Sequence, residues 1–145
     1  MNIRSVTHDD LNNLVLIFEE YRAFYKCNSD LISAYKFISE RIENKDAEIF
    51  VAEADNQLVG FIQLYPLFSS TRMKKLWLLN DLFVQPFYRG RGISKELITK
   101  AKQLANETNS AGLILETVKT NEIANQLYKR EGFELDLEHN YYAWS

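Results

Sequence analysis

Two glycines and two arginines occupy four consecutive positions, Arg89, Gly90, Arg91 and Gly92, where a strand-like run gives way to a helix-like one. A helix that begins near Gly92 leaves its first backbone N–H groups without intrahelical partners and presents the positive end of its dipole. Glycine allows close backbone approach to a ligand, and arginine adds charge-assisted hydrogen bonds to anions. The stretch therefore predicts a phosphate or pyrophosphate site. A glycine turn with solvated arginines is the alternative.

Two common phosphate-binding motifs do not fit this stretch. A P-loop has a longer spacer between its glycines and ends in Gly-Lys followed by Ser or Thr, whereas here Ile93, Ser94 and Lys95 follow Gly92. The dinucleotide fingerprint GxGxxG requires a third glycine where this chain has Lys95. A nucleotide-binding protein of either type is thus disfavoured.

Composition narrows the class of protein. With 145 residues, 46% of them hydrophobic, the chain can bury one sizeable core, so a single domain spanning 1–145 is expected. A formal net charge of −3 gives no general attraction to phosphate backbones. We therefore expect no nucleic acid partner and no anionic membrane partner.

Cysteine and histidine are scarce. The single cysteine, Cys27, cannot form an internal disulfide, and together with two histidines it cannot supply an ordinary metal-ligand set. No stretch reaches the apolar length that spans a bilayer, and the N-terminus carries no cleavage signature. These features favour a cytoplasmic protein without a bound metal.

The periodicity of apolar residues predicts alternating strands and helices. Thr7 with Asp10 predicts a cap for a first helix, and Ser29 or Asp30 a cap for a second. The expected order begins with strand 2–6 and these two helices, followed by strands 48–54 and 58–65, which are joined by a turn at Asp55 and Asn56. Strand 75–84, a helix from about 93 to 104 and strand 113–116 come next. The last expected elements are a helix around 124–128, which ends before Gly132, and a tail, 133–144, that returns to the sheet. Such an order implies a mixed sheet with helices on both faces.

Two segments, in order, resemble motifs of the GNAT superfamily of acyl-CoA-dependent N-acyltransferases. The coenzyme A loop of that family reads Arg or Gln, two residues, Gly, one residue, then Gly or Ala. Here Arg89, Gly92 and Ser94 take those places, with serine as the departure. The segment TNEIANQLYKREGFE resembles a later family motif through Asn121, Ala124, Leu127, Tyr128, Gly132 and Phe133.

The resemblance implies an α/β fold of the mixed α+β type. Its mostly antiparallel, twisted sheet has six or seven strands, with a splay between the fourth and fifth strands that holds the pantetheine arm. The resemblance also implies the coenzyme contacts: backbone groups of Leu82, Phe83 and Val84 on the arm, Arg89, Gly90, Arg91, Gly92, Ile93, Ser94 and Lys95 around the pyrophosphate, and Asn121 on the arm from the other side.

Such a site brings together an amine and a thioester. The amine must be neutral to attack, although a free alkylammonium resembles lysine with a pKa of about 10.4, and the leaving thiolate resembles cysteine at about 8.5. The resemblance implies that Tyr128 is the acid for the thiolate, and a packing tyrosine is the alternative. Glu116 matches the basic glutamate of the ribosomal-protein N-terminal acetyltransferases, although it also fits a solvated carboxylate. Asp81, a carboxylate within an apolar run, and bulk water are competing bases.

The acceptor pocket is expected between the first two helices and a loop over 64–70. Its predicted substrate-binding residues are Tyr25, Tyr65, Ser69, Asn80 and Asp81. The predicted function is direct transfer of an acetyl group from acetyl-CoA, a co-substrate, to a primary amine of a small molecule or peptide in a ternary complex. A non-catalytic acyl-CoA-binding sensor or interaction module is the alternative. A homodimer is the expected assembly.

Overall fold

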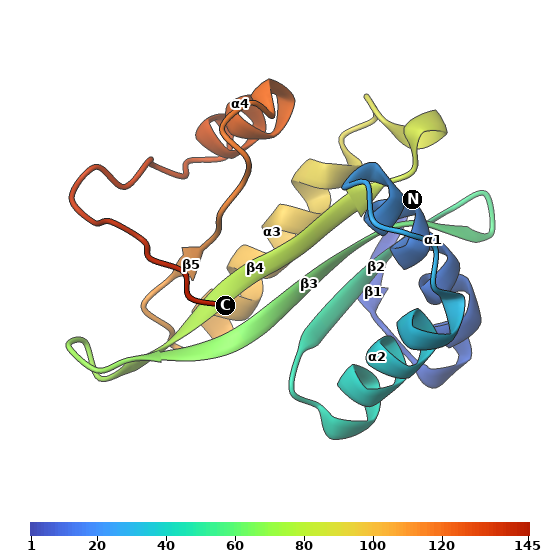
Figure 1. Cartoon of the computed structure of the whole chain (residues 1–145), viewed down its shortest axis with the longest axis horizontal. Coiled ribbons are helices and arrows are strands. Elements are labelled where there is room, and N and C mark those ends of the chain that lie inside the picture. Colours follow the sequence, from blue (N-terminus) through green and yellow to red (C-terminus); the bar gives the residue numbers. More distant parts are fainter. The chain divides into compact units, whose positions relative to one another are not determined.

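The computed structural model describes residues 1–145, which form two compact units, 1–115 and 116–145. The first unit holds a five-stranded sheet in the order β1-β2-β3-β4-β5 and three α-helices (Figure 1). Its elements are β1 (Asn2–Ser5), a 3₁₀ turn (His8–Asp10), α1 (Leu11–Phe24), α2 (Leu31–Asn44), β2 (Glu48–Ala54), β3 (Gln57–Ser69), β4 (Lys74–Val84), a 3₁₀ turn (Pro86–Tyr88), α3 (Ile93–Glu107) and β5 (Leu113–Ile114).

Local sequence signals explain how several of these elements start and turn. The Thr7 backbone N–H donates to Asp10 Oδ2 at 2.7 Å, which fixes the turn before α1. Asp30 caps α2, because its Oδ1 accepts a hydrogen bond from the Ser33 N–H at 3.1 Å. Asp55 and Asn56 have φ angles of 52° and 61°, in the left-handed region that a tight hairpin requires. The predicted caps and hairpin are confirmed.

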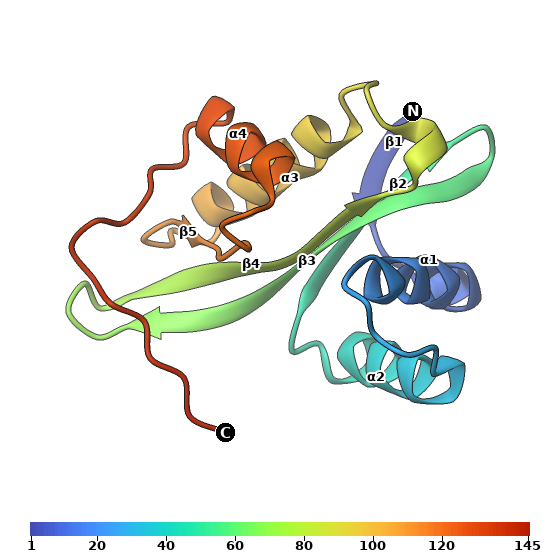
Figure 2. The ribbon, with the colours of Figure 1, turned by 45° about the horizontal axis from the view of Figure 1, so that its top comes forward.

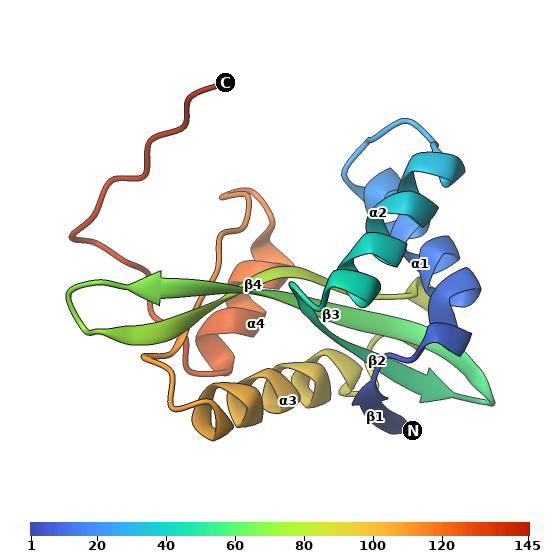
Figure 3. The same ribbon diagram turned by 90° about the horizontal axis from the view of Figure 1, so that it is seen from below.

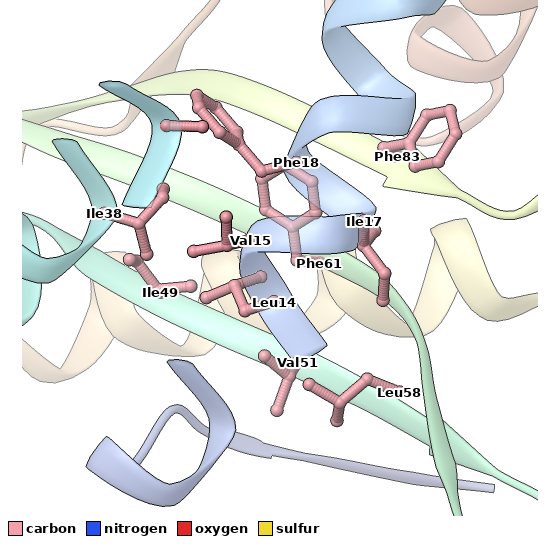
Figure 4. Packing of buried hydrophobic residues seen from close by; sticks show 11 residues of the cluster. Leu14, Val15, Ile17, Phe18, Ile38, Ile49, Val51, Leu58, Phe61 and Phe83 are labelled. Atoms are coloured by element: carbon pink, nitrogen blue, oxygen red, sulfur yellow. The ribbon is translucent and has the colours of Figure 1, made fainter. Parts of the chain in front are cut away.

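Helices cover both faces of the sheet. α1 and α2 pack against each other on one face (Figure 2), and α3 lies on the opposite face (Figure 3). Leu14, Phe18 and Ile38 from α1 and α2 meet Phe61 of β3 and Phe83 of β4 in one buried cluster (Figure 4). Gln63 and Tyr65, two and four residues after Phe61 on β3, therefore face α1 and α2 as well.

The fourth and fifth strands share only a short ladder. Neighbouring strands from β1 to β4 are antiparallel, whereas β5 runs parallel to β4 and pairs only with Trp77 and Leu78. The last part of β4, residues 79–84, therefore has no β5 partner along its outer edge.

The expectation of six or seven strands is wrong, because the sheet has five. β5 ends at Ile114, so its outer edge offers almost no ladder that a further strand could extend. The tail, 133–144, forms no strand, although its alternating apolar residues fit one. Alternation shows that a segment can pair, but it does not supply the neighbouring edge.

The expected loop over 64–70 is also wrong, since β3 continues to Ser69. Pro66 lies opposite Trp77, whose N–H donates to the Gly112 carbonyl oxygen at 3.1 Å, away from β3. Two residues opposite each other in an antiparallel pair either both point their backbone N–H and C=O groups toward the partner strand or both point them away from it. Because Trp77 points its N–H away from β3, Pro66 points its nitrogen away from β4. β2 pairs with β3 only as far as Leu64, and proline is tolerated at such a free edge.

The second unit contains α4 (Glu122–Arg130) followed by an extended tail. Asn121 caps the helix, since its Oδ1 accepts from the Ala124 N–H at 3.1 Å. Gly132, with φ 90°, ends it in the left-handed conformation common after helices.

Candidate active site

The loop between β4 and α3 presents unpaired backbone donors. Gly90 and Gly92 have φ angles of 77° and 80°, and a Cβ at either position would meet no atom within 4 Å. The first α3 hydrogen bond runs from the Glu96 N–H to the Gly92 carbonyl oxygen at 3.1 Å. The N–H groups of Ile93, Ser94 and Lys95 precede that bond, and the helix has no side-chain cap. This arrangement suits an anion.

The two loop arginines are held by different groups. Arg89 Nε donates to the Val84 carbonyl oxygen at 2.8 Å, and its guanidinium lies 5.4 Å from the centre of the Phe83 ring. The Arg91 guanidinium lies over the rings of Phe87 and Tyr88, at 5.2 and 5.0 Å. Arg89 therefore ties the loop to the end of β4, while Arg91 stays beside the loop on an aromatic support.

The end of β4 exposes backbone groups along its outer edge. The Gln85 N–H donates to the Val59 carbonyl oxygen at 2.8 Å, so Gln85 points its backbone toward β3. Alternation along the strand then directs the backbone groups of Leu82 and Val84 away from β3 and those of Phe83 toward it. Of the three predicted arm-binding residues, Leu82 and Val84 thus face the edge that β5 leaves unpaired.

A pocket of about 870 Å³ adjoins this loop at the C-terminal end of α1. Phe24, Phe83, Phe87 and Arg89 are among its lining residues, whereas Asp81 is not. The pocket lies beside the β4–α3 loop and includes Arg89, but it includes neither Gly90 nor Gly92.

A β-bulge turns Asp81 toward α1 and α2. Gln63 pairs with Asp81 and Leu64 with Leu79, so Asn80 has no partner across the ladder. In a regular strand Asp81, two residues after Leu79, would share the face of Leu79, and the bulge at Asn80 moves it to the other face. Asp81 is 6% exposed, and its Oδ2 accepts hydrogen bonds from Gln63 Nε2 at 2.7 Å and Asn80 Nδ2 at 3.1 Å.

Sequence reasoning missed Gln63. The available signal was a glutamine inside the apolar run LVGFIQLY, since a buried amide is costly unless it is hydrogen-bonded. Only the strand register shows that its partner is Asp81.

The Asp81 carboxylate contributes to raised pKa values of two tyrosines, Tyr25 and Tyr65. Burial raises the pKa of Tyr65 to about 12, with a further contribution from the Asp81 carboxylate. Burial first, and then Asp81, also raises the pKa of Tyr25. Ser69 is not part of this group, because it lies six residues beyond Gln63 along β3, roughly 20 Å in an extended strand. The Ser69 hydroxyl instead accepts from the Arg72 N–H in the next turn, at 3.4 Å.

The second unit carries Glu116, Asn121 and Tyr128. Glu116 is exposed and lies outside β5, which ends two residues earlier. Asn121 uses its Oδ1 as the helix cap, which leaves its Nδ2 out of that bond. The Tyr128 ring packs edge-to-face on Phe133, with centroids 5.7 Å apart. Asn121 and Tyr128 are nearly two helical turns apart and so lie on one side of α4.

Neither a metal cluster nor a membrane span occurs in the structure. No group of three or more His, Cys, Asp or Glu side chains is placed to hold a metal ion. None of the helices combines the length and apolarity that a bilayer crossing requires.

Comparison with known proteins matches the acetyltransferase (GNAT) family to residues 14–133. The chain belongs to the GNAT acetyltransferase family. A GNAT acetyltransferase is an acyltransferase enzyme, and the family uses acetyl-CoA as co-substrate.

Individual relatives agree with this assignment. The uncharacterized N-acetyltransferase YhfO of Bacillus subtilis is 40% identical, with 94% of this chain and 91% of the relative covered. A putative ribosomal protein bS18 alanine N-acetyltransferase of Bacillus subtilis is 28% identical over 74% of this chain and 68% of its own length. A crystal structure of a probable acetyltransferase has a TM-score of 0.95 and 37% identity, covering 100% of this GNAT chain and 97% of its own.

Proposed function

We propose that this GNAT enzyme transfers an acetyl group from acetyl-CoA directly to a primary amine of a small molecule or peptide in a ternary complex. The observation that carries the proposal is the uncapped N-terminus of α3, which follows Gly90 and Gly92 in the left-handed conformation. Backbone N–H groups and the helix dipole both favour the pyrophosphate there. The residues proposed to surround it run from Arg89 to Lys95.

The pantetheine arm is proposed to lie along the outer edge of β4. That edge has no β5 partner beyond Leu78, and the backbone groups of Leu82 and Val84 face it. A pantetheine amide would complete hydrogen bonds that no strand makes. Asn121 is proposed to contact the arm through its Nδ2, since its Oδ1 serves as the α4 cap.

Tyr128 is proposed as the general acid and Glu116 as the general base. A phenol can protonate the departing thiolate, and an exposed carboxylate can take a proton from the amine directly or through water. The similarity to a putative ribosomal protein alanine N-acetyltransferase supports the role of Glu116. Asp81 is the competing base within the first unit.

We also propose that residues 1–145 form one acetyltransferase domain that works as a cytoplasmic homodimer. The family match runs through both units, which supports the single domain. The dimer is supported by the tail, where Leu137, Tyr142 and Trp144 are 86%, 91% and 96% exposed. Side chains of this size rarely remain uncovered together on a monomer.

The assembly is tested by light scattering after size exclusion. The intact protein is expected to have twice the chain mass, and a variant carrying both Tyr142→Glu and Trp144→Glu to have the mass of one chain. Ile32→Glu, at another exposed apolar residue on α2, is the control and should leave the mass unchanged. A monomeric intact protein contradicts the dimer.

The reaction is tested by release of free coenzyme A from acetyl-CoA with a panel of primary amines that includes polyamines, amino acids, aminoglycosides and peptides. Release that depends on an amine, with the acetylated amine identified by mass spectrometry, is the expected result. Tight acetyl-CoA binding without release in any mixture would instead favour the non-catalytic module.

A further inference from the structure

β3 and β4 continue past the neighbouring strands as a two-stranded arm, residues 67–76 (Figure 2). Pairing with a third strand ends at Leu64 on the β3 edge and at Trp77 on the β4 edge. Within the arm, β3 and β4 therefore pair only with each other. A two-stranded hairpin is at best marginally stable in water, so a further surface is expected to cover it.

The end of the arm is both apolar and basic. Phe68 and Met73 are 78% and 89% exposed. The charged residues of the arm are all basic, namely Arg72, Lys74 and Lys75, and none of them forms an ion pair within the chain. Exposed apolar side chains with a charged rim are typical of a surface that binds another protein. The arm therefore fits a partner segment that is apolar and acidic.

The tail, residues 133–145, has this composition. It contains Glu134, Asp136 and Glu138 and neither lysine nor arginine. Asp136 serves a turn within the tail, because its Oδ1 accepts from the Glu138 N–H at 2.9 Å. The carboxylates of Glu134 and Glu138 form no ion pair within the chain. Leu135 and Leu137, which alternate with these acidic residues, are 71% and 86% exposed.

We propose that the tail of one copy of the chain binds the arm of a second copy, and that the two copies are related by a twofold axis. Such a dimer covers two arms and two tails at once, because a twofold interface uses the same surfaces of both copies. Opposite charges at the rim fix the register and disfavour other partners, while apolar residues of the tail cover Phe68 and Met73. The inference rests on the homodimer of the proposed function and adds the surface that the tail binds.

The test reverses the charges of each surface. The arm variant carries Arg72→Glu and Lys74→Glu, and the tail variant carries Glu134→Lys and Glu138→Lys. All four side chains are exposed, so each variant should fold, which circular dichroism verifies. Each variant alone places like charges against each other in the dimer. Its dimer dissociation constant, measured by sedimentation equilibrium, should rise at least about tenfold.

Mixing the two variants shows whether the arm and the tail are partners. In a heterodimer of the arm variant with the tail variant, opposite charges meet at both contacts. An equimolar mixture should therefore form heterodimers about as tightly as the wild-type chain dimerises, as detected by native mass spectrometry. A chain that carries all four substitutions should form homodimers again, for the same reason.

A control reverses the same amount of charge on another surface. Lys36→Glu combined with Lys45→Glu changes two exposed lysines, one within α2 and one directly after it, and should leave the dissociation constant unchanged. If the arm and tail variants both dimerise as tightly as wild type, the pairing is overturned and the homodimer stands. If both are monomers and neither the mixture nor the fourfold variant dimerises, the pairing is overturned as well.

The reaction is measured on the same samples by amine-dependent release of coenzyme A. A wild-type protein that is monomeric and releases coenzyme A overturns the arm–tail dimer and leaves the proposed acetyl transfer intact. Heterodimers that form only in the mixture, without any acetyl transfer, support the pairing and contradict the reaction.

Discussion

Arg89 Nε donates a hydrogen bond to the Val84 carbonyl oxygen, 2.8 Å away, and so joins the first residue of the proposed pyrophosphate-binding segment, 89–95, to the last residue of β4. Because Val84 faces the edge that β5 leaves unpaired, this bond holds the loop beside that edge. The proposed sites for pyrophosphate and pantetheine are therefore adjacent within one unit.

Replacing Gly92 by valine should abolish acetyl-CoA binding. Its φ of 80° strains any β-branched residue, and the new side chain would project into open space where the coenzyme is proposed to lie. Gly112→Val is the control, because that glycine has a φ of 142° and equally open surroundings outside the loop. Calorimetry with acetyl-CoA is the measurement. Unchanged affinity in the Gly92 variant would mean that the coenzyme binds elsewhere.

Arg91→Ala should weaken acetyl-CoA binding by about 1–3 kcal/mol, the range for a hydrogen bond to a charged group. The Arg91 guanidinium lies over the rings of Phe87 and Tyr88 and donates to the Phe87 carbonyl oxygen at 3.4 Å, so these neutral groups position it. Arg72→Ala, in the turn between β3 and β4, removes the same charge at a distance and should have little effect. An equal loss of acetyl-CoA affinity in the two variants would mean that Arg91 acts only through its long-range charge. In that case raised salt should weaken acetyl-CoA binding to the wild-type protein and reduce the effect of both substitutions.

Asp10→Asn should lower the free energy of unfolding by about 1–3 kcal/mol at neutral pH. Asp10 is 7% exposed and accepts from Arg4 Nη1 and Nη2 at 2.7 and 2.8 Å. These hydrogen bonds from Arg4 lower the Asp10 pKa below its ordinary value of 3.8. Since the folded-state pKa is depressed, the stabilisation is complete well above that value and is lost as pH falls through the folded-state pKa.

Urea unfolding between pH 7 and pH 2 measures this difference. The gap between wild type and Asp10→Asn should be constant near neutral pH and should close in the acid range. Asp9→Asn, at the exposed neighbouring carboxylate, is the control and should follow wild type throughout. A gap that stays constant down to pH 2 would show that the Asp10 charge contributes no stability.

The sequence predicted the elements that depend on neighbours along the chain. The Thr7 and Asp10 pattern, the Asp30 cap and the Asp55–Asn56 turn all act within a few residues, and each occurs as expected. Likewise, Gly90 and Gly92 adopt the left-handed conformation that glycine accommodates more readily than other residues.

Features that depend on pairing between strands far apart in the chain could not be predicted from the sequence. In the run LWLLNDLFV no period shows which face Asp81 takes, and only the register with β3 places the bulge at Asn80. A proline such as Pro66 predicts the end of a strand, because it cannot donate a ladder hydrogen bond. It fits within β3 only because β2 pairs with β3 no further than Leu64, and the sequence does not show where that pairing ends. The tail has the alternation of a strand, but pairing needs an edge that the tail itself does not specify.

Glu116→Gln should lower turnover with little change in acetyl-CoA affinity. If Glu116 takes the proton from the amine, the loss should be greatest at neutral pH and smaller at alkaline pH, where more amine is already neutral. Turnover from pH 6.5 to 10 is the measurement, with Glu122→Gln as the control for removal of an exposed carboxylate. A pH profile parallel to that of wild type would point to Asp81 or bulk water as the base.

Tyr128→Phe should lower turnover by roughly 10² to 10⁴, the usual contribution of general acid catalysis, while acetyl-CoA affinity stays nearly constant. The phenylalanine keeps the edge-to-face packing on Phe133 and removes only the hydroxyl. The loss should shrink with an acyl donor whose thiol is more acidic, because a better leaving group needs less protonation. Tyr142→Phe, in the exposed tail, is the matched control. Wild-type turnover in Tyr128→Phe would leave Tyr128 as a packing residue, and it would shift protonation of the thiolate to solvent.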